Sequence, residues 1–379
     1  MMAKILFLMR YPLHRNDNLK LKFDGEMAAA RALGHEVHYI GWDKDRLLLC
    51  GEEDPELIQT CPFAKLPAYG KTVFYIDLMN ALKKVILENQ IDLVYMRFMP
   101  TFGNAPDAMT ALKAKGGKLI VEHPTYPFEN GKTTSLLRMP VFAYNAKVFG
   151  RMEPMIDLYT LIGEHCDGML NGRPAMNIVN GVDVNQYQQH KPCTGTSDIH
   201  MLALASMSHW QGYDRLIRAL AKDQSEEQVY VHMVGNDGDG SLKAWEKLSD
   251  ELGTSERVIF HGELHGDALD QIVAKCDIGI GGLGLYRKGQ LSSMTLKVRE
   301  YMARGLPFVY AVDDPVVPDD SRFCLKLRND DSDIDMQQIV NFAKSAKVNA
   351  DVPAHMRSYA RAHMSWEGIM RAVFEKAGI

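Results

Sequence analysis

The sequence predicts an α/β protein made of two doubly wound domains, and three observations carry this prediction. The 379 residues suffice for two domains of roughly 150 residues each. Short apolar strands alternate with amphipathic helices in two separate runs, which is typical of parallel sheets covered on both faces. A polar stretch with Pro, Gly and Ser, 185–199, separates the runs. We therefore expect domains over 1–190 and 191–355, and a C-terminal helical segment, 356–379, that packs back towards the first domain.

The first run begins with the apolar strand Ile5–Met9 and a polar loop. The helix that follows, Leu19–Leu33, is expected to end at Gly34, because glycine readily adopts the left-handed conformation that terminates helices. The same alternation then continues through strand Glu36–Ile40, helix Val73–Glu88, strand Asp92–Met96, helix Asp107–Lys115 and strand Lys118–Glu122.

The second run repeats this alternation after the polar stretch. Its expected elements are strand Met201–Ser206, helix Tyr213–Lys222, strand Val229–Val234, helix Leu242–Leu252, strand Val258–His261, helix Ala268–Cys276, strand Ile278–Leu283, helix Met294–Arg304 and strand Pro307–Val312. Ligands of open α/β sheets bind outside the carboxyl ends of the strands. Two such halves facing each other predict a ligand-binding cleft at those ends.

Charge and cysteine content exclude several classes of protein. The formal net charge is −5, so no excess of positive charge is present to neutralise the phosphates of a nucleic acid. The six cysteines are scattered, which indicates neither a disulfide scaffold nor a metal site and favours a reducing compartment. No run approaches the ~18 apolar residues of a membrane span, and the N-terminal apolar run is too short for a secretory signal. We expect a soluble cytoplasmic protein.

The segment Ile278–Val312 carries the strongest chemical signal. A strand runs into a glycine-rich bend and then into a helix that Ser292 or Ser293 is expected to cap. One face of that helix is polar and consists of Ser293, Lys297, Glu300 and Arg304. The N–H groups and dipole at the helix start suit a diphosphate, and Glu300, about 10 Å further along the axis, suits a ribose diol. The alternative is a solvated helix face with ion pairs.

Several segments resemble family 4 glycosyltransferases, which are retaining enzymes with the GT-B fold. Along the chain these segments occur in the order typical of that family. The helix segment LKVREYMARGLPFV, Leu296–Val309, resembles their nucleotide-sugar-binding segment. Ile178–Tyr187 (IVNGVDVNQY) and Arg257–Gly262 (RVIFHG) also match the family. The stretches Trp210–Ile217 (WQGYDRLI) and Pro124–Phe128 (PTYPF) resemble bacterial enzymes of surface and capsular polysaccharide assembly.

The resemblance implies roles for individual residues of the second domain. Glu300 matches the second glutamate of the family's E-x7-E motif, which holds the ribose, whereas Ser292 replaces the first glutamate. Ser206 and Gln211 stand where the family has an arginine and a lysine for the diphosphate. We infer that three basic residues elsewhere supply the missing positive charge: Arg287, Lys288 and Lys297. Arg287 and Lys297 are also catalytic candidates. The other donor-binding candidates are Ser292, Ser293, Met294, Thr295 and Gly235.

In the first domain, His123 roughly matches a family histidine near the donor sugar, and it is therefore a catalytic candidate. A lone histidine at the end of a strand is as often structural, in which case Glu122 and Thr125 are the neighbouring candidates. The family's glycine pair after the first strand is absent here. The segment that replaces it, Arg10–Gly25, carries Lys20 and Lys22 on the expected acceptor side.

The resemblance implies sugar transfer from a nucleotide-sugar donor to a saccharide acceptor, with retention and without a covalent intermediate. Neither a metal nor another cofactor is expected, and the acceptor is expected to be lipid-linked, at the inner face of the cell membrane. The segment Lys132–Met152 has four basic residues and no acidic ones, so it is either an interfacial segment on anionic lipid or a loop and core helix.

Two motifs and two functions compete with this interpretation. Gly279–Gly284 fits G-x-G-x-x-G, but seven residues separate it from the helix, which argues against NAD. Asp237-Gly238-Asp239 is either a metal-binding pair or, as we expect, a turn. The competing functions are a nucleotide-sugar epimerase or phosphorylase and a non-catalytic nucleotide-binding homologue. The departures at Ser292, Ser206 and Gln211 would favour the non-catalytic homologue.

Overall fold

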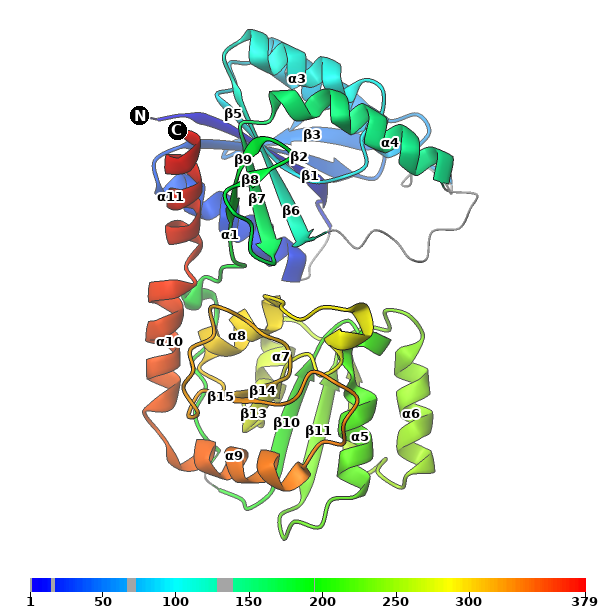
Figure 1. The fold of residues 1–379 in the computed structure, drawn as a ribbon, viewed down its shortest axis with the longest axis vertical. Helices are drawn as coiled ribbons and strands as arrows, with labels where there is room; N and C mark the ends of the chain where they lie inside the picture. The colour runs from blue at the N-terminus through cyan, green and yellow to red at the C-terminus, as the bar shows by residue number, and fades with distance from the viewer. Residues whose placement is uncertain (1, 15–17, 67–72, 128–138, 194) are drawn as a thin grey trace. The chain divides into compact units, whose positions relative to one another are not determined.

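The computed structural model describes residues 2–14, 18–66, 73–127, 139–193 and 195–379, which form two compact units (Figure 1). The first unit contains Met1–Val179 and Trp366–Ile379, and the second contains Asn180–Ser365. One large sheet lies in each unit, with helices packed on it. The predicted α/β class is confirmed.

The sheet of the first unit has nine strands in the order β4-β3-β2-β1-β5-β6-β7-β9-β8. It is parallel from β2 to β9, and an antiparallel hairpin extends each edge. The strands are β1 (Lys4–Pro12), β2 (Glu36–Asp43), β3 (Arg46–Cys50), β4 (Glu56–Thr60), β5 (Leu93–Arg97), β6 (Lys118–Tyr126), β7 (Leu158–Gly163), β8 (Met169–Leu170) and β9 (Arg173–Asn177).

Helices cover both faces of this sheet. Three of them, α2 (Val73–Glu88), α3 (Ala105–Ala114) and α4 (Met139–Met152), pack on one face. The other face carries α1 (Asn18–Ala32) and the C-terminal helix α11 (Trp366–Ala377), which lie side by side (Figure 1). The first and last helices of the chain thus share one layer.

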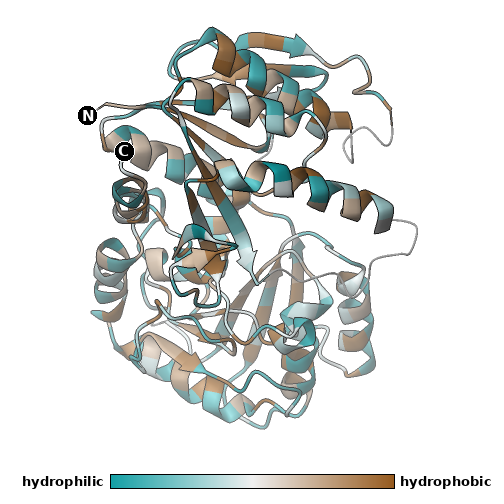
Figure 2. Ribbon diagram, turned by 45° about the horizontal axis from the view of Figure 1, so that its top comes forward, coloured by the Kyte–Doolittle hydropathy of each residue, from teal (hydrophilic) through white to brown (hydrophobic). Residues whose placement is uncertain are grey.

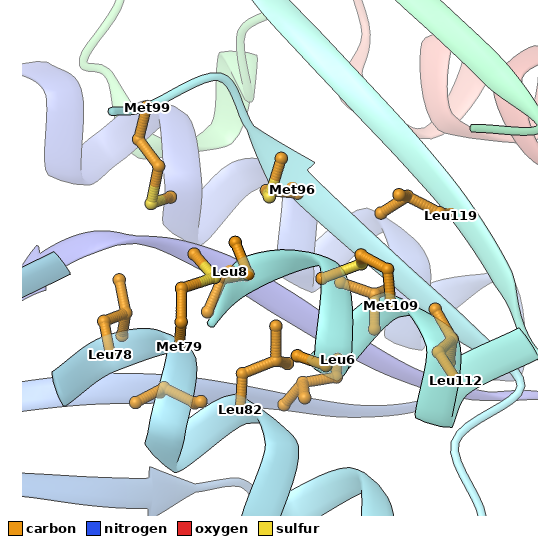
Figure 3. Close-up of a cluster of buried hydrophobic side chains, with 14 of the residues drawn as sticks. Leu6, Leu8, Leu78, Met79, Leu82, Met96, Met99, Met109, Leu112 and Leu119 are labelled. Carbon is orange, nitrogen blue, oxygen red and sulfur yellow. The ribbon is translucent and has the colours of Figure 1, made fainter. Parts of the chain in front are cut away.

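The alternation of side chains along β1 explains how the first unit is packed. Leu6 and Leu8 point towards α2 and α3, where they meet Leu82 and Met109 (Figure 3). Burying a side chain of this size contributes about 1.5–3 kcal/mol, so this layer is a main source of the stability of the unit. Residues of β1 between these leucines, such as Phe7, are buried on the opposite face.

The sheet of the second unit has six parallel strands in the order β12-β11-β10-β13-β14-β15. The strands are β10 (Ile199–Leu204), β11 (Val229–Val234), β12 (Val258–Gly262), β13 (Ile278–Ile280), β14 (Phe308–Tyr310) and β15 (Cys324–Lys326). Because all strands are parallel, their carboxyl ends form one edge, and the loops that follow β10, β11 and β13 gather there.

Both faces of the second sheet are also covered, so it is doubly wound as predicted. Met201 and Ala203 of β10 pack with α5 (Tyr213–Ala221), α6 (Ser241–Glu251) and α9 (Met336–Val348). Leu202 and Leu204 pack on the other face with α7 (Gly266–Val273), α8 (Leu296–Arg304) and α10 (Val352–His363). Figure 2 shows the helices with interleaved apolar and polar residues, as this packing requires.

The boundaries between the units differ from those predicted. The second unit begins at Asn180 rather than near residue 191, because Arg357 of α10 donates to the carbonyls of Val184 (3.1 Å) and Tyr187 (3.0 Å). The C-terminal segment is also divided: α10 belongs to the second unit, and only α11 belongs to the first. The single helical segment predicted over 356–379 is therefore two elements in two units.

Candidate functional site

Glycines shape the carboxyl edge of the second sheet. A Cβ atom on Gly279 would lie 2.7 Å from the Tyr301 ring, and one on Gly284 would lie 2.8 Å from the Cα of Gly212. The latter contact joins the loop after β13 to the short helix η5 (His209–Gln211), which precedes α5. The G-x-G-x-x-G spacing thus has a packing explanation that needs no dinucleotide.

The loop after β13 continues through η6 (Leu285–Lys288) to α8, whose start differs from the prediction. Thr295 rather than Ser292 or Ser293 is the N-cap residue. Ser292 and Ser293 are extended and pair with Asp313, whose carbonyl accepts a hydrogen bond from the Ser293 N–H (2.8 Å). This pairing with the segment after β14 keeps both serines outside the helix.

Lys297, in the first turn of α8, is a buried ammonium group with neutral partners. Its side chain donates to Gln211 Oε1 (2.6 Å) and to Tyr213 Oη (2.9 Å), and the residue is 7% exposed. No carboxylate among the described residues lies within ion-pair distance of its Nζ. Burial lowers the pKa of Lys297 to about 7. Gln211 and Tyr213 were not predicted as partners of Lys297, although both lie within WQGYDRLI.

Glu300 lies one turn further along the same face of α8. Its Oε1 accepts from Arg304 Nε (2.8 Å), and Arg304 also donates to Asp270 of α7 (2.7 Å). Burial raises the pKa of Glu300, whereas the charge of Arg304 opposes this shift. Tyr187 completes the group, with its ring centroid 4.9 Å from the Arg304 guanidinium carbon.

The polar face of α8 is therefore not a solvated one. Lys297, Glu300 and Arg304 are each less than a tenth exposed. The predicted ion pair four residues apart does form, between Glu300 and Arg304, but it is buried. Ligands of open α/β sheets generally bind at the carboxyl edge of the strands, and three buried polar groups on one helix face there are typical of a site rather than of a surface.

Arg287 and Lys288, in η6, have different surroundings from Lys297. Arg287 forms a two-pronged ion pair with Asp214 of α5 (2.7 and 2.9 Å) and donates to the His209 carbonyl. The charge of Arg287 is thus compensated within the protein. Lys288 is exposed, and its Nζ lies 4.1 Å from the Trp210 ring centroid. Of the three basic residues singled out from the sequence, Lys297 is the one that is buried without a carboxylate partner among the described residues.

The loops after β10 and β11 meet at the same edge. Gly235 has φ 144°, and a Cβ atom there would lie 1.6 Å from the Ala205 carbonyl oxygen, so only glycine fits. The carboxylates of Asp237 and Asp239 accept hydrogen bonds from backbone N–H groups, including those of Gly240 and His209. The aspartate pair therefore shapes a turn, as expected. No group of three or more potential metal-ligating side chains is found among the described residues.

In the first unit, Glu122 is the centre of a buried charged network and lies in the middle of β6, which continues to Tyr126 rather than ending at Glu122 as predicted. It accepts hydrogen bonds from Lys22 Nζ (2.8 Å), Tyr95 Oη (2.8 Å) and Arg97 Nη1 (2.9 Å). Lys22 also pairs with Glu26 in the next turn of α1. Burial alone would raise the pKa of Glu122, but the charges of Lys22 and Arg97 outweigh it and lower the pKa. The pKa of Glu26 shifts in the opposite direction, because burial and the negative charge of Glu122 both raise it.

The His123 side chain lies on the opposite face of the sheet from that of Glu122, because adjacent residues of a strand point to opposite faces. Its ring lies 2% exposed among Phe98, Phe149 and Tyr159, with centroids 4.6 to 6.5 Å away. Burial lowers the pKa of His123 to about 4, so the ring is neutral at pH 7. This environment favours the structural alternative for His123.

The remaining first-unit candidates are less buried. Thr125 is exposed, and Lys20 is half-buried and pairs with Asp24. Residues 15–17 of the predicted acceptor-side segment, Phe128 of the PTYPF stretch and residues 132–138 of the predicted interfacial segment lie outside the described residues. A cavity of about 580 Å³ in this unit lies at the opposite edge, among Lys4, Glu36 and other residues at the amino ends of β1 and β2.

The chain is similar to several known proteins. Residues 189–319 match the family model described as Glycosyl transferases group 1. The structure of HepE from Anabaena in complex with UDP is similar, with 15% identity, 99% coverage of each chain and a TM-score of 0.61. Sucrose-phosphate synthase from Thermosynechococcus elongatus is 14% identical over 98% of each chain, with a TM-score of 0.67. No curated protein matches the chain in its amino-acid sequence.

A glycosyltransferase from Rickettsia africae is similar as well, with 14% identity over 99% of this chain and 98% of the other, and a TM-score of 0.65. At such identities the likeness concerns the fold, which in these neighbours is the GT-B fold with two Rossmann-like domains. Lys297, Glu300 and Arg304 all fall within the family match. The chain therefore has the GT-B fold, and residues 189–319 are similar to the glycosyl transferases group 1 family.

Proposed function

We propose that this protein is a glycosyltransferase that moves a sugar from a nucleotide-sugar donor to a saccharide acceptor. The observation that carries the proposal is the polar face of α8, which lies within the family match and presents Lys297 and Glu300 at the carboxyl edge of the second sheet. The HepE structures with UDP and with UDP-glucose support a nucleotide-sugar donor.

Each group on this face suits one part of such a donor. Lys297 Nζ and the free N–H groups in the first turn of α8 suit the diphosphate. Glu300, a turn further on, suits the ribose hydroxyls, since a carboxylate accepts two hydrogen bonds well. Stabilisation of the leaving diphosphate by a preorganised positive charge accelerates sugar transfer without a protein nucleophile. Arg287 and Lys288 then act at longer range, with Asp214 holding Arg287.

Several finer features belong to the same proposal. The resemblance of segment Leu296–Val309, in which Glu300 matches the second glutamate of E-x7-E while Ser292 departs from the first, supports membership of family 4, retention of anomeric configuration and independence of metal ions. The resemblance to capsular polysaccharide enzymes supports a cytoplasmic role in polysaccharide assembly on a lipid-linked acceptor. The acceptor side is assigned to the first unit, near Lys20, Lys22, Glu122 and Thr125.

A thermal-shift panel with UDP-, GDP-, ADP- and CMP-sugars tests donor binding. A ligand at 100 times its dissociation constant stabilises the native state by about 2.7 kcal/mol, which raises the melting temperature by a few degrees. We expect one nucleotide class to do so, and Glu300→Gln to weaken its binding at least tenfold. Glu246→Gln, an exposed glutamate on α6, is the matched control and should bind normally. Stabilisation by NAD alone would contradict the proposal.

Product analysis separates transfer from the competing activities. Incubation of the selected donor with crude acceptor lipids should yield a lengthened saccharide and free nucleoside diphosphate. Conversion of the donor without any acceptor would favour an epimerase or phosphorylase. Donor binding with no product would favour a non-catalytic homologue.

We further propose that α4 contacts an anionic membrane. Val141, Phe142 and Tyr144 are about half exposed, and Lys147 and Arg151 are exposed on the same helix. Apolar and basic side chains together bind anionic lipid surfaces, with about 1 kcal/mol from each basic residue. No helix in the described part of the chain is long and apolar enough to span a bilayer. Co-sedimentation with phosphatidylglycerol vesicles at low salt tests the proposal, and equal binding by Phe142→Ser and the native protein would contradict it.

A further inference from the structure

The buried ammonium of Lys297 lacks a counter-charge, and this feature has a consequence for ligand binding. The charged groups on the elements around it are already paired with one another. Asp214, next to Tyr213, is held by Arg287, and Glu300 and Arg299 on α8 itself are held by Arg304 and Asp314. The groups that face Nζ are the amide oxygen of Gln211 and the hydroxyl of Tyr213, both neutral.

These two partners satisfy both protonation states of the amine. As an ammonium, Nζ donates to Gln211 and Tyr213 and retains a third N–H. As a neutral amine, it still donates to Gln211, while the Tyr213 hydroxyl donates to its lone pair. Burial favours the neutral form, which places the pKa of Lys297 near neutrality in the unliganded protein. The neutral state costs the hydrogen bond that the Tyr213 hydroxyl otherwise donates to the Ile280 carbonyl (3.3 Å), and that carbonyl keeps the one from the Tyr301 hydroxyl (3.1 Å). The geometry therefore accommodates both protonation states of the amine.

We propose that Lys297 takes up a proton from solvent when the diphosphate of a nucleotide sugar binds, so that donor binding is coupled to protonation of this amine. The inference rests on the proposed function and goes beyond it. The diphosphate of a nucleotide sugar carries two negative charges, and opposite charges nearby favour the protonated amine. A new N–H bond forms on Nζ, the buffer supplies the proton, and the third N–H is directed to a phosphate oxygen.

Coupling of this kind has a defined dependence on pH. Because the bound state holds more protons than the free state above pH 7, affinity falls as pH rises through that range. The sign follows from linkage: uptake of one proton weakens binding about tenfold for each pH unit. At pH 6 the amine is already charged, so uptake is small and affinity is nearly constant.

Titration calorimetry of the full chain tests the inference, with UDP-glucose, ADP-glucose and GDP-glucose as probes. These are diesters of diphosphate, so their phosphates do not themselves titrate near neutrality. The observed heat is compared in two buffers of different ionisation enthalpy, which gives the number of protons taken up. We expect about half a proton at pH 7 and about one proton at pH 8.5. Histidines contribute little at the higher pH.

Two variants assign the proton to Lys297. Lys297→Arg keeps a permanent charge and should bind the donor with no proton uptake and no loss of affinity between pH 7 and 8.5. Lys297→Met, which removes the charge in a similar volume, should bind weakly and without proton uptake. Lys243→Met, an exposed lysine on α6, is the matched control and should retain the native uptake.

The outcomes separate the inference from the proposed function. Donor binding without proton uptake by the native protein overturns the inference and leaves the proposed function standing. Uptake that persists in both Lys297 variants also overturns it. If none of the three conjugates binds, the proposed donor site is wrong, and the inference falls with it.

Discussion

The charged residues that join elements of this protein and line its candidate site are buried rather than exposed. In the first unit, Lys22 compensates Glu122 and Glu26 in a network that is closed to water. The sequence indicates Lys22 and Glu122 as candidates on the acceptor side. The structure gives them an additional role, since together they join α1 to β6.

The variant Lys22→Met tests that structural role. Removing one partner from a buried ion pair leaves uncompensated charge and typically costs about 3–5 kcal/mol. We expect the melting temperature of the first unit to fall by several degrees in differential scanning calorimetry. Lys20→Met is a matched control two residues away, because Lys20 pairs with the part-exposed Asp24, and such pairs contribute only about 0–1 kcal/mol. Equal melting of both variants would show that the network does not stabilise this unit.

The sequence predicts the positions of the site residues better than it predicts their interaction partners. The helical period places Lys297, Glu300 and Arg304 on one face, and in the structure all three are buried and Glu300 contacts Arg304. The partners come from far along the chain: Asp214 is 73 residues from Arg287, and Gln211 is 86 residues from Lys297. No local pattern indicates which distant group will neutralise a charge, so the contrast between Arg287 and Lys297 is not predictable from the sequence.

At the level of elements, long periodic segments are predicted well and short edge strands are not. Helix Val73–Glu88 and strand Val229–Val234 are found with the predicted bounds. Strands β3 and β4 are missed, because the chain enters β3 from β2 through a turn at Lys44 with φ 53°, a conformation that lysine rarely adopts. Both strands have five residues and lie at a sheet edge, where the alternation of apolar and polar side chains is weakest.

The start of α8 shows how pairing between distant segments overrides a local signal. Ser292 and Ser293 are good N-cap residues, and the sequence predicts a helix that begins after one of them. The pairing of this segment with Asp313 holds both serines extended, so the helix begins three residues later than Ser292 would require, at Leu296. Because the helix begins at Leu296, Lys297 lies in its first turn, where the helix dipole favours binding of an anion.

On the scale of the whole molecule, the chain passes between its units twice, at Val179–Asn180 and at Ser365–Trp366. The two passages are adjacent in the second unit, where the Val182 N–H donates to the Met364 carbonyl (2.7 Å). After the second passage, α11 packs on the first unit, and Lys118 Nζ donates to the Ala377 and Gly378 carbonyls. The C-terminal residues therefore complete a unit that begins at the opposite end of the chain.

A chain that ends at Ser365 should therefore lose stability in its first unit alone. It would expose the partners of four buried apolar side chains of α11, each contributing about 1.5–3 kcal/mol; these are Trp366, Met370, Val373 and Phe374. That loss is comparable to the total stability of a typical domain. We expect calorimetry to show loss of the first-unit transition while the second unit melts unchanged.

A single substitution tests the same contact without shortening the chain. A Cβ atom on Gly25 of α1 would lie 2.3 Å from Trp366 Cδ1, so Gly25→Ala must push the two helices apart, at a typical cost of about 1–3 kcal/mol. Gly150→Ala in α4 is the matched control, because its Cβ meets no atom within 4 Å and alanine favours the helix. We expect the first-unit melting temperature to fall in Gly25→Ala and to hold or rise in Gly150→Ala. If both variants melt alike, the close approach of α1 and α11 does not hold the C-terminal helix to the first unit.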